Sequence, residues 1–121
     1  MQIDISRFDH CRLLVVGDLM IDEYVWGEVD RISPEAPVQV VSVKNEDYTL
    51  GGSGNVVNNL VTLGAKVSVL GVTGTGRGRK LLLNRLSDLG VDTRGVIQER
   101  SRPTTKKTRI IADHQQVLRI D

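Results

Sequence analysis

Three glycines and an asparagine stand close together in the segment from Gly51 to Asn55, which reads GGSGN. Glycine lets the backbone approach a ligand closely, and a helix that begins there directs free N–H groups and the positive end of its dipole at the same place. Such a turn suits hydroxyl groups or an anion. It also fits a tight loop without a ligand, and it lacks the G-x-G-x-x-G spacing of a dinucleotide site.

Two carboxylates, Asp18 and Asp22, follow the first apolar run of the chain. If that run is a strand, they lie beyond its carboxyl end, where open α/β sheets place their ligands. A carboxylate there can accept hydrogen bonds from two neighbouring sugar hydroxyls. A turn cap is the alternative for either residue, and the spacing of a calcium loop is absent.

The stretch from Arg100 to Arg109 is basic. Alternation along a strand places Thr105, Lys107 and Arg109 on one face and Lys106 and Thr108 on the other. Two cations and a hydroxyl on one face suit a phosphate group. Charge alone fits equally well a solvated edge strand whose lysines block association between sheets.

A second glycine-rich segment, Gly74 to Lys80, imitates a phosphate-binding loop without matching it. The G-x-x-x-x-G-K-[ST] pattern counted from Gly74 requires a glycine where Arg79 stands and a hydroxyl where Leu81 stands. We therefore interpret the segment as a turn. His10, His114 and Cys11 have no ligand-type spacing, so the sequence predicts no metal site.

These residues must be positioned by short apolar runs that alternate with two stretches of helical periodicity, the second with Leu82, Leu86 and Leu89 on one stripe. The predicted order is βββαβαβββ, an α/β fold with a mostly parallel sheet and additional antiparallel strands. Two strands flank the stiff connector Ser33 to Pro37, and a hairpin turns at Asp113 to Gln115. The strands are expected at 12–17, within 24–43, at 66–72, 91–98, 104–112 and 116–121, and the helices end at Gly64 and Gly90.

Length and composition exclude several classes of protein. A chain of 121 residues forms one domain at most, so we expect residues 1–121 to be part of a single domain. A net charge of +1 and 3% aromatic residues argue against a nucleic-acid partner. No apolar run approaches the ~20 residues of a membrane span, and no signal peptide is evident, so a cytoplasmic protein is expected.

Three segments together resemble the start of a ribokinase-family (PfkB-type) carbohydrate kinase, and the resemblance runs from Leu13 to Asp121. They are GDLMID at 17–22, RISPEAPV at 31–38 and GGSGNVVNNL at 51–60. RISPEAPV and the last eighteen residues, TTKKTRIIADHQQVLRID, are most similar to the family's heptose 7-phosphate kinase branch, which in many bacteria is fused to an adenylyltransferase domain.

The resemblance implies a ribokinase-like three-layer α/β/α fold with a small β-sheet lid, of which this chain carries the N-terminal part. It implies ATP-dependent phosphorylation of the anomeric hydroxyl of D-glycero-D-manno-heptose 7-phosphate, for ADP-heptose and lipopolysaccharide core synthesis. Asp22 matches the family's sugar-binding aspartate, and Gly51, Gly52 and Asn55 match the turn that closes over the sugar. Our hypothesis assigns Lys107 and Arg109 to the 7-phosphate, and a homodimer through the lid strands is expected.

Two departures from the family pattern matter. The acidic turn usual after the strand at 66–72 is replaced by Gly74 to Gly78, and the Gly-Ala-Gly-Asp motif that carries the general base does not occur within these 121 residues. We therefore expect the general-base aspartate and the site for ATP and Mg beyond residue 121, and no turnover by this chain alone. Two alternatives stay open, namely a related kinase for an unphosphorylated sugar and a non-catalytic module that binds sugar phosphates.

Overall fold

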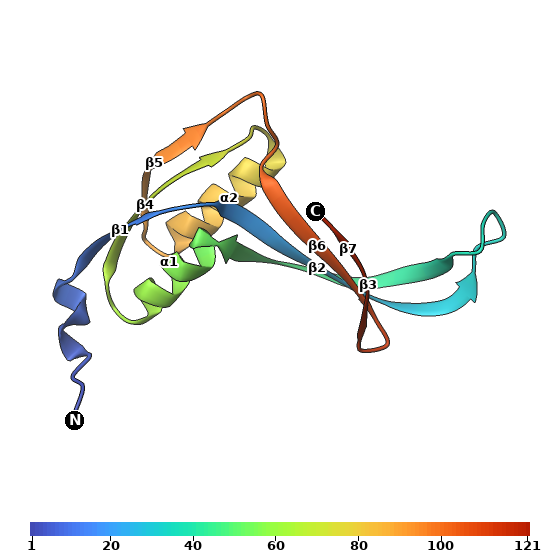
Figure 1. The fold of residues 1–121 in the computed structure, drawn as a ribbon, viewed down its shortest axis with the longest axis horizontal. Coiled ribbons are helices and arrows are strands. Elements are labelled where there is room, and N and C mark those ends of the chain that lie inside the picture. The colour runs from blue at the N-terminus through green and yellow to red at the C-terminus, as the bar shows by residue number, and fades with distance from the viewer. The chain divides into compact units, whose positions relative to one another are not determined.

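The computed structural model describes residues 1–121, and its elements follow the predicted order (Figure 1). The strand β2 begins at Leu19 rather than near Tyr24, and β3 continues to Gly52. Asp22 therefore lies inside a strand and not in a loop after β1. The elements are a 3₁₀ helix Ser6–His10, β1 Arg12–Val16, β2 Leu19–Ile32, β3 Gln39–Gly52, α1 Ser53–Thr62, β4 Lys66–Thr73, α2 Arg77–Asp88, β5 Asp92–Gln98, β6 Thr105–Ala112 and β7 Gln115–Ile120.

The chain divides into two compact units. Unit 1 comprises Met1–Ile21 and Leu50–Thr105, and unit 2 comprises Asp22–Thr49 and Lys106–Asp121. Unit 1 therefore holds the strands β1, β4 and β5 with both α-helices, and unit 2 holds most of the long strands β2 and β3 together with the hairpin of β6 and β7.

A three-stranded parallel sheet forms the centre of unit 1, with β4 between β1 and β5 (Figure 1). The pairing of β1 with β4 runs from Arg12 opposite Lys66 to Val16 opposite Leu70. The pairing of β4 with β5 is also parallel and contains one irregularity, between Ser68 and Leu70. The parallel sheet predicted from the short apolar runs is thus confirmed.

The helices cover one face of this sheet. Alternate residues of β4, including Val67 and Val69, are buried, and α1 and α2 contribute the fully buried Val57, Leu82 and Leu86. Helix α1 contacts β1 and β4, while α2 contacts β5. The period of two on β4 and the spacing of four between Leu82 and Leu86 are the patterns that bury one face of each element. Neither helix is long and apolar enough to cross a membrane.

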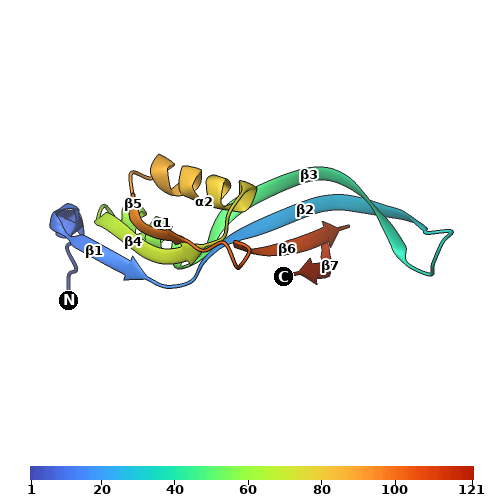
Figure 2. The same cartoon turned by 90° about the horizontal axis from the view of Figure 1, so that it is seen from above.

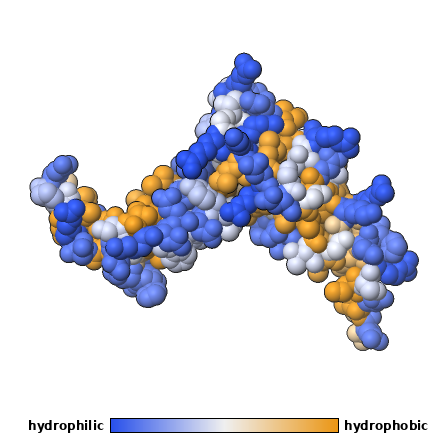
Figure 3. Space-filling model, turned by 180° about the vertical axis from the view of Figure 1, so that it is seen from behind, coloured by the Kyte–Doolittle hydropathy of each residue, from blue (hydrophilic) through white to orange (hydrophobic).

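The opposite face of the sheet stays open in this chain. Leu14 and Val16 on β1 are 62% and 65% exposed, and Leu70 on β4 is 39% exposed. Apolar side chains at the molecular surface can be followed as orange atoms in Figure 3. Unit 1 therefore has a layer of helices and a layer of strands. These are two of the three layers of the α/β/α fold that the resemblance implies.

Unit 2 is built on a four-stranded sheet in the order β3-β2-β6-β7. Strands β2 and β3 run side by side, as both Figure 1 and Figure 2 show. Strands β6 and β7 form the predicted antiparallel hairpin, in which Arg109 lies opposite Arg119. Its turn is Asp113-His114, with φ values of 52° and 65°, and Gln115 already belongs to β7. Asp and His tolerate this left-handed geometry better than most residues, which suits a two-residue hairpin turn.

The core of unit 1 can be tested at Leu86, which is fully buried on α2. Replacing Leu86 by alanine leaves a cavity, and Leu86→Ala should lower the free energy of unfolding by about 2–5 kcal/mol in urea denaturation. Leu63, which is 45% exposed at the end of α1, provides the control. Leu63→Ala should change the free energy of unfolding by less than about 1 kcal/mol. Equal losses in the two variants would contradict the assignment of the core.

Candidate functional site: a glycine turn and a charged sheet face

The six residues predicted to bind substrate are divided between the two units. Gly51, Gly52 and Asn55 lie in unit 1, at the junction of β3 and α1. Asp22, Lys107 and Arg109 lie in unit 2, on β2 and β6. The structure brings together members of each group, and the convergence of both groups on one ligand stays a prediction.

Gly52 is the residue that shapes the turn in unit 1. It precedes α1 with φ 57° and ψ −131°, a backbone conformation that residues with a side chain rarely adopt. A Cβ at this position would collide with the carbonyl oxygen of Asp18 and lie 2.9 Å from Cε of Met20. The amide of Ser53 donates to the same Asp18 oxygen at 2.8 Å. Two independent constraints therefore demand glycine at position 52.

The first turn of α1 offers polar groups beside this glycine. Asn55 is exposed, so its amide is available to a ligand. The hydroxyl oxygen of Ser53 is buried and has no hydrogen-bond partner. No acidic side chain of α1 itself lies in its first turn, at the positive end of the helix dipole. The turn can therefore serve hydroxyls or an anion, as its sequence suggests.

In unit 2, Asp22 and Arg109 form an ion pair. The carboxylate Oδ1 of Asp22 and the guanidinium Nη1 of Arg109 are 3.4 Å apart, with 20% and 25% of their side chains exposed. Arg109 also lies over the ring of Tyr24, 5.5 Å from its centroid. The Tyr24 ring stacks on Trp26 with centroids 6.2 Å apart. Asp22, Tyr24 and Trp26 alternate along β2, so this face carries a carboxylate followed by two aromatic rings.

The other face of the same strands carries a second carboxylate, Glu23, whose side chain is 13% exposed. Its Oε1 accepts a hydrogen bond from the Thr108 hydroxyl at 3.0 Å, and Lys106 Nζ lies 3.8 Å from Oε2. Lys106 and Thr108 thus share a face that Arg109 does not, as the alternation predicts. We attribute to Glu23 the role of anchoring β6 to β2, because a partly buried carboxylate needs such partners.

Two further charged residues of unit 2 were missed in the sequence analysis, Arg119 and Asp121. Arg119 donates from Nε and Nη2 to the two carboxylate oxygens of Asp121, at 2.8 and 2.7 Å. These hydrogen bonds lower the pKa of Asp121, and the positive fields of Lys107 and Arg109 lower it further. The pKa of Arg119 is raised chiefly by the same hydrogen bonds and, to a lesser extent, by the field of Asp22. The signal for Arg119 was its place in the hairpin register opposite Arg109.

The turn between β4 and α2 is held by hydrogen bonds within unit 1. Arg79, which stands where a phosphate-binding loop needs glycine, donates from Nη1 to the buried Thr73 hydroxyl at 2.6 Å. The amide of Gly74 donates to Thr104 Oγ1 at 3.0 Å. The Arg79 guanidinium and the Gly74 amide are thus engaged within unit 1. No group of three or more acidic, histidine or cysteine side chains lies together in the chain.

The fold and these motifs define a class of protein, and residues 11–121 match the model of the pfkB family carbohydrate kinases. The chain therefore belongs to the pfkB family of carbohydrate kinases. It is 64% identical over 118 residues to the bifunctional protein HldE of Desulfatibacillum aliphaticivorans, with 98% of this chain and 24% of that protein covered. It is 53% identical over 119 residues to the bifunctional protein HldE of Geobacter sulfurreducens, again with 24% of the relative covered. The chain thus spans about a quarter of the length of these relatives.

Solved structures support the fold. An Arabidopsis thaliana ribokinase complexed with ribose and ATP superposes with a TM-score of 0.72 at 24% identity, covering 91% of this chain and 35% of that one. A carbohydrate kinase from Agrobacterium tumefaciens gives a TM-score of 0.71 at 21% identity, with 91% and 34% of the two chains covered. The ribokinase-like fold expected from the sequence is confirmed.

Two features require glycine at position 52, namely its positive φ and the close approach of Asp18 and Met20, and they can be tested separately. Gly76 is the matched control, because it precedes α2 with φ 86° and a Cβ there would meet nothing within 4 Å. Gly76→Ala should cost about 1–3 kcal/mol of stability for the backbone conformation alone. Gly52→Ala should cost more than Gly76→Ala, since its Cβ also displaces Asp18 or Met20. Urea denaturation of both variants checks this, and a smaller loss for Gly52→Ala would contradict the close approach.

Proposed function

We propose that this chain provides the acceptor-sugar-binding part of a kinase that phosphorylates the anomeric hydroxyl of D-glycero-D-manno-heptose 7-phosphate with ATP, for ADP-heptose and lipopolysaccharide core synthesis. The high identity to proteins named HldE supports this heptose assignment. The observation that carries it within the structure is the ion pair of Asp22 and Arg109. It sets an acceptor of hydroxyl hydrogen bonds beside a cation suited to phosphate.

Each group has a separate task in this proposal. Asp22 accepts hydrogen bonds from sugar hydroxyls and so orients the ring. The turn at Gly51, Gly52 and Asn55 closes over the sugar with backbone and amide groups. Lys107 and Arg109, on one face of β6, hold the 7-phosphate. Such positioning is the larger share of what a kinase contributes, because phosphoryl transfer depends on alignment and on stabilising charge.

ATP and Mg are the co-substrates that the family implies, and ATP supplies the transferred phosphoryl group. In this chain the turn between β4 and α2 holds Arg79, which donates to Thr73, in place of the second glycine of a phosphate-binding loop. The proposal therefore places the general base and the nucleotide site on residues outside this chain. Because the reaction consumes ATP, it also places the protein in the cytoplasm.

The acceptor assignment can be tested by calorimetric titration of the chain with heptose 7-phosphate and with unphosphorylated heptose. Lys107→Ala should weaken binding of the phosphorylated sugar about tenfold or more, since a charge-assisted hydrogen bond contributes roughly 1.5–3 kcal/mol. Its binding of unphosphorylated heptose should not change. Asp22→Asn should weaken binding of both sugars.

Lys106→Ala is the matched control, because Lys106 is the adjacent lysine on the opposite face of β6 and contacts Glu23. It should leave both affinities unchanged. Equal effects of Lys106→Ala and Lys107→Ala would reject the phosphate assignment. Tighter binding of ribose than of heptose 7-phosphate would instead favour a kinase for an unphosphorylated sugar.

We further propose that two copies associate through the lid strands β2, β3, β6 and β7. Leu118 and Ile120 on β7, an edge strand, are each 52% exposed, and such apolar surface favours association. Sedimentation velocity should show a dimer for the chain and a monomer for Leu118→Asp. Leu63→Asp, which places the same charge on an exposed position of unit 1, should remain dimeric. A monomeric parent chain would contradict the proposal.

A further inference from the structure

We propose that Arg119 is a third phosphate-binding cation, which acts with Lys107 and Arg109 as one subsite on the Asp22 face of the unit 2 sheet. The ligand class is a phosphate monoester carried by a sugar. The inference rests on the proposed function for the identity of that sugar, but the cluster of cations stands on the geometry of unit 2 alone.

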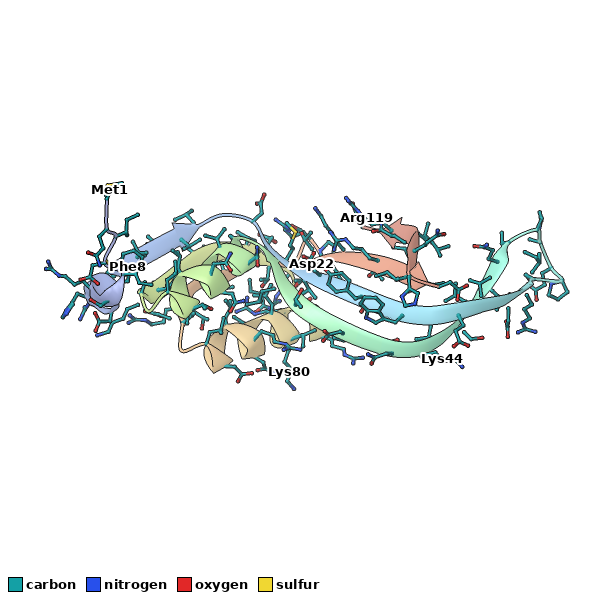
Figure 4. All side chains as sticks on the ribbon, turned by 90° about the horizontal axis from the view of Figure 1, so that it is seen from below. Met1, Phe8, Asp22, Lys44, Lys80 and Arg119 are labelled. Atoms are coloured by element: carbon teal, nitrogen blue, oxygen red, sulfur yellow. The ribbon has the colours of Figure 1, made fainter.

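The hairpin register creates the cluster. Arg109 on β6 lies directly opposite Arg119 on β7, so both side chains project from the same face of the sheet. Their Cβ atoms are then only about 4.5–5.5 Å apart. Lys107 joins them from two residues earlier on β6. Asp22 on β2 and Arg119 on β7 are labelled in Figure 4, which shows the strands that present this face.

Like charges directly opposite each other destabilise a strand pair, so Arg109 opposite Arg119 needs an anion nearby. Asp22 and Asp121 supply two negative charges against the three cations. One net positive charge therefore remains on this face. A phosphate dianion would bridge the two strands through the fork-shaped guanidinium groups, and together with Asp22 it would balance the three cations once Asp121 moves aside.

Arg109 also has hydrogen-bonding capacity to spare. Its Nη1 is buried and donates to no acceptor, although Asp22 Oδ1 lies 3.4 Å away. A buried donor without an acceptor is costly, and native structures rarely keep one. A phosphate oxygen placed between Arg109 and Arg119 would accept from this group.

The Asp121 carboxylate would compete with a phosphate ligand for Arg119. This carboxylate occupies Nε and Nη2 of Arg119, the two donors that a phosphate would use. The side chains of Arg119 and Asp121 are 46% and 53% exposed, so the pair can open at little cost. Binding thus exchanges one carboxylate for a ligand of higher charge, without any covalent step.

The experiment titrates the chain with inorganic phosphate, heptose 7-phosphate and unphosphorylated heptose, followed by calorimetry. Arg119→Gln should weaken the two phosphate ligands at least tenfold and leave unphosphorylated heptose unchanged. Arg94→Gln is the matched control, because Arg94 also pairs with an aspartate two residues away, Asp92, at 2.7 Å. It should alter none of the three affinities.

A second variant guards against simple misfolding. Asp121→Asn removes the competing carboxylate, so it should bind both phosphate ligands several-fold more tightly, and damage to the fold does not produce such a gain. Weaker phosphate binding by Asp121→Asn, or unchanged phosphate binding by Arg119→Gln, would overturn the subsite.

The two proposals fail in different ways. If Arg119→Gln has no effect while Asp22→Asn weakens both heptoses, the subsite is rejected and the acceptor assignment stands. If neither heptose binds but inorganic phosphate binds in an Arg119-dependent manner, the heptose assignment is rejected and the subsite stands.

Discussion

The alternation of side chains between the two faces of β2 and β6 is the constraint on which the charge pairs of unit 2 depend. Asp22 and Glu23 are consecutive, so the strand sends their carboxylates to opposite faces. The side chains of β6 alternate in the same way. Arg109 pairs with Asp22 on one face, and Thr108 and Lys106 contact Glu23 on the other. A slip of one residue would exchange every partner and leave Glu23 facing a cation meant for the other side. The register and the charges therefore specify each other.

The two faces use their carboxylates differently because their surroundings differ. Glu23 is the more buried and is satisfied by a hydroxyl and an ammonium group, which makes it part of the framework. Asp22 contacts a guanidinium at ion-pair distance without a hydrogen bond, beside two stacked aromatic rings. Polar atoms with unused hydrogen-bonding capacity are what a ligand requires. The Asp22 face is for this reason the stronger candidate for recognition.

In unit 1 two helices must begin next to a parallel sheet. Both α1 and α2 follow a glycine with positive φ, yet only Gly52 lies tightly against neighbouring atoms. At the second helix Arg79 folds back onto Thr73 and ties α2 to the end of β4. Two similar glycine-rich segments thus have different roles. Gly52 brings the start of α1 close to Asp18 and Met20, and the segment with Arg79 secures the end of the sheet.

The sequence by itself determined the order of the elements, the parallel sheet and the face on which each residue of β6 lies, because periodicity and glycine stops are local properties. It also indicated Asp22, the Gly51 to Asn55 turn and the basic strand. Only the tertiary structure decided that β2 begins early enough to contain Asp22, that Arg109 pairs with it and that Arg119 lies opposite Arg109. The pairing of Asp22 with Arg109 joins segments more than eighty residues apart, as the neighbouring bond of Glu23 with Thr108 also does, and no single stretch of residues encodes it. The position of Arg119 opposite Arg109 depends on the hairpin turn, which the sequence placed at Asp113 to Gln115 and the structure forms with two residues, Asp113 and His114. Long-range pairing is selected by the free energy of the whole sheet, so it emerges only when the strands meet.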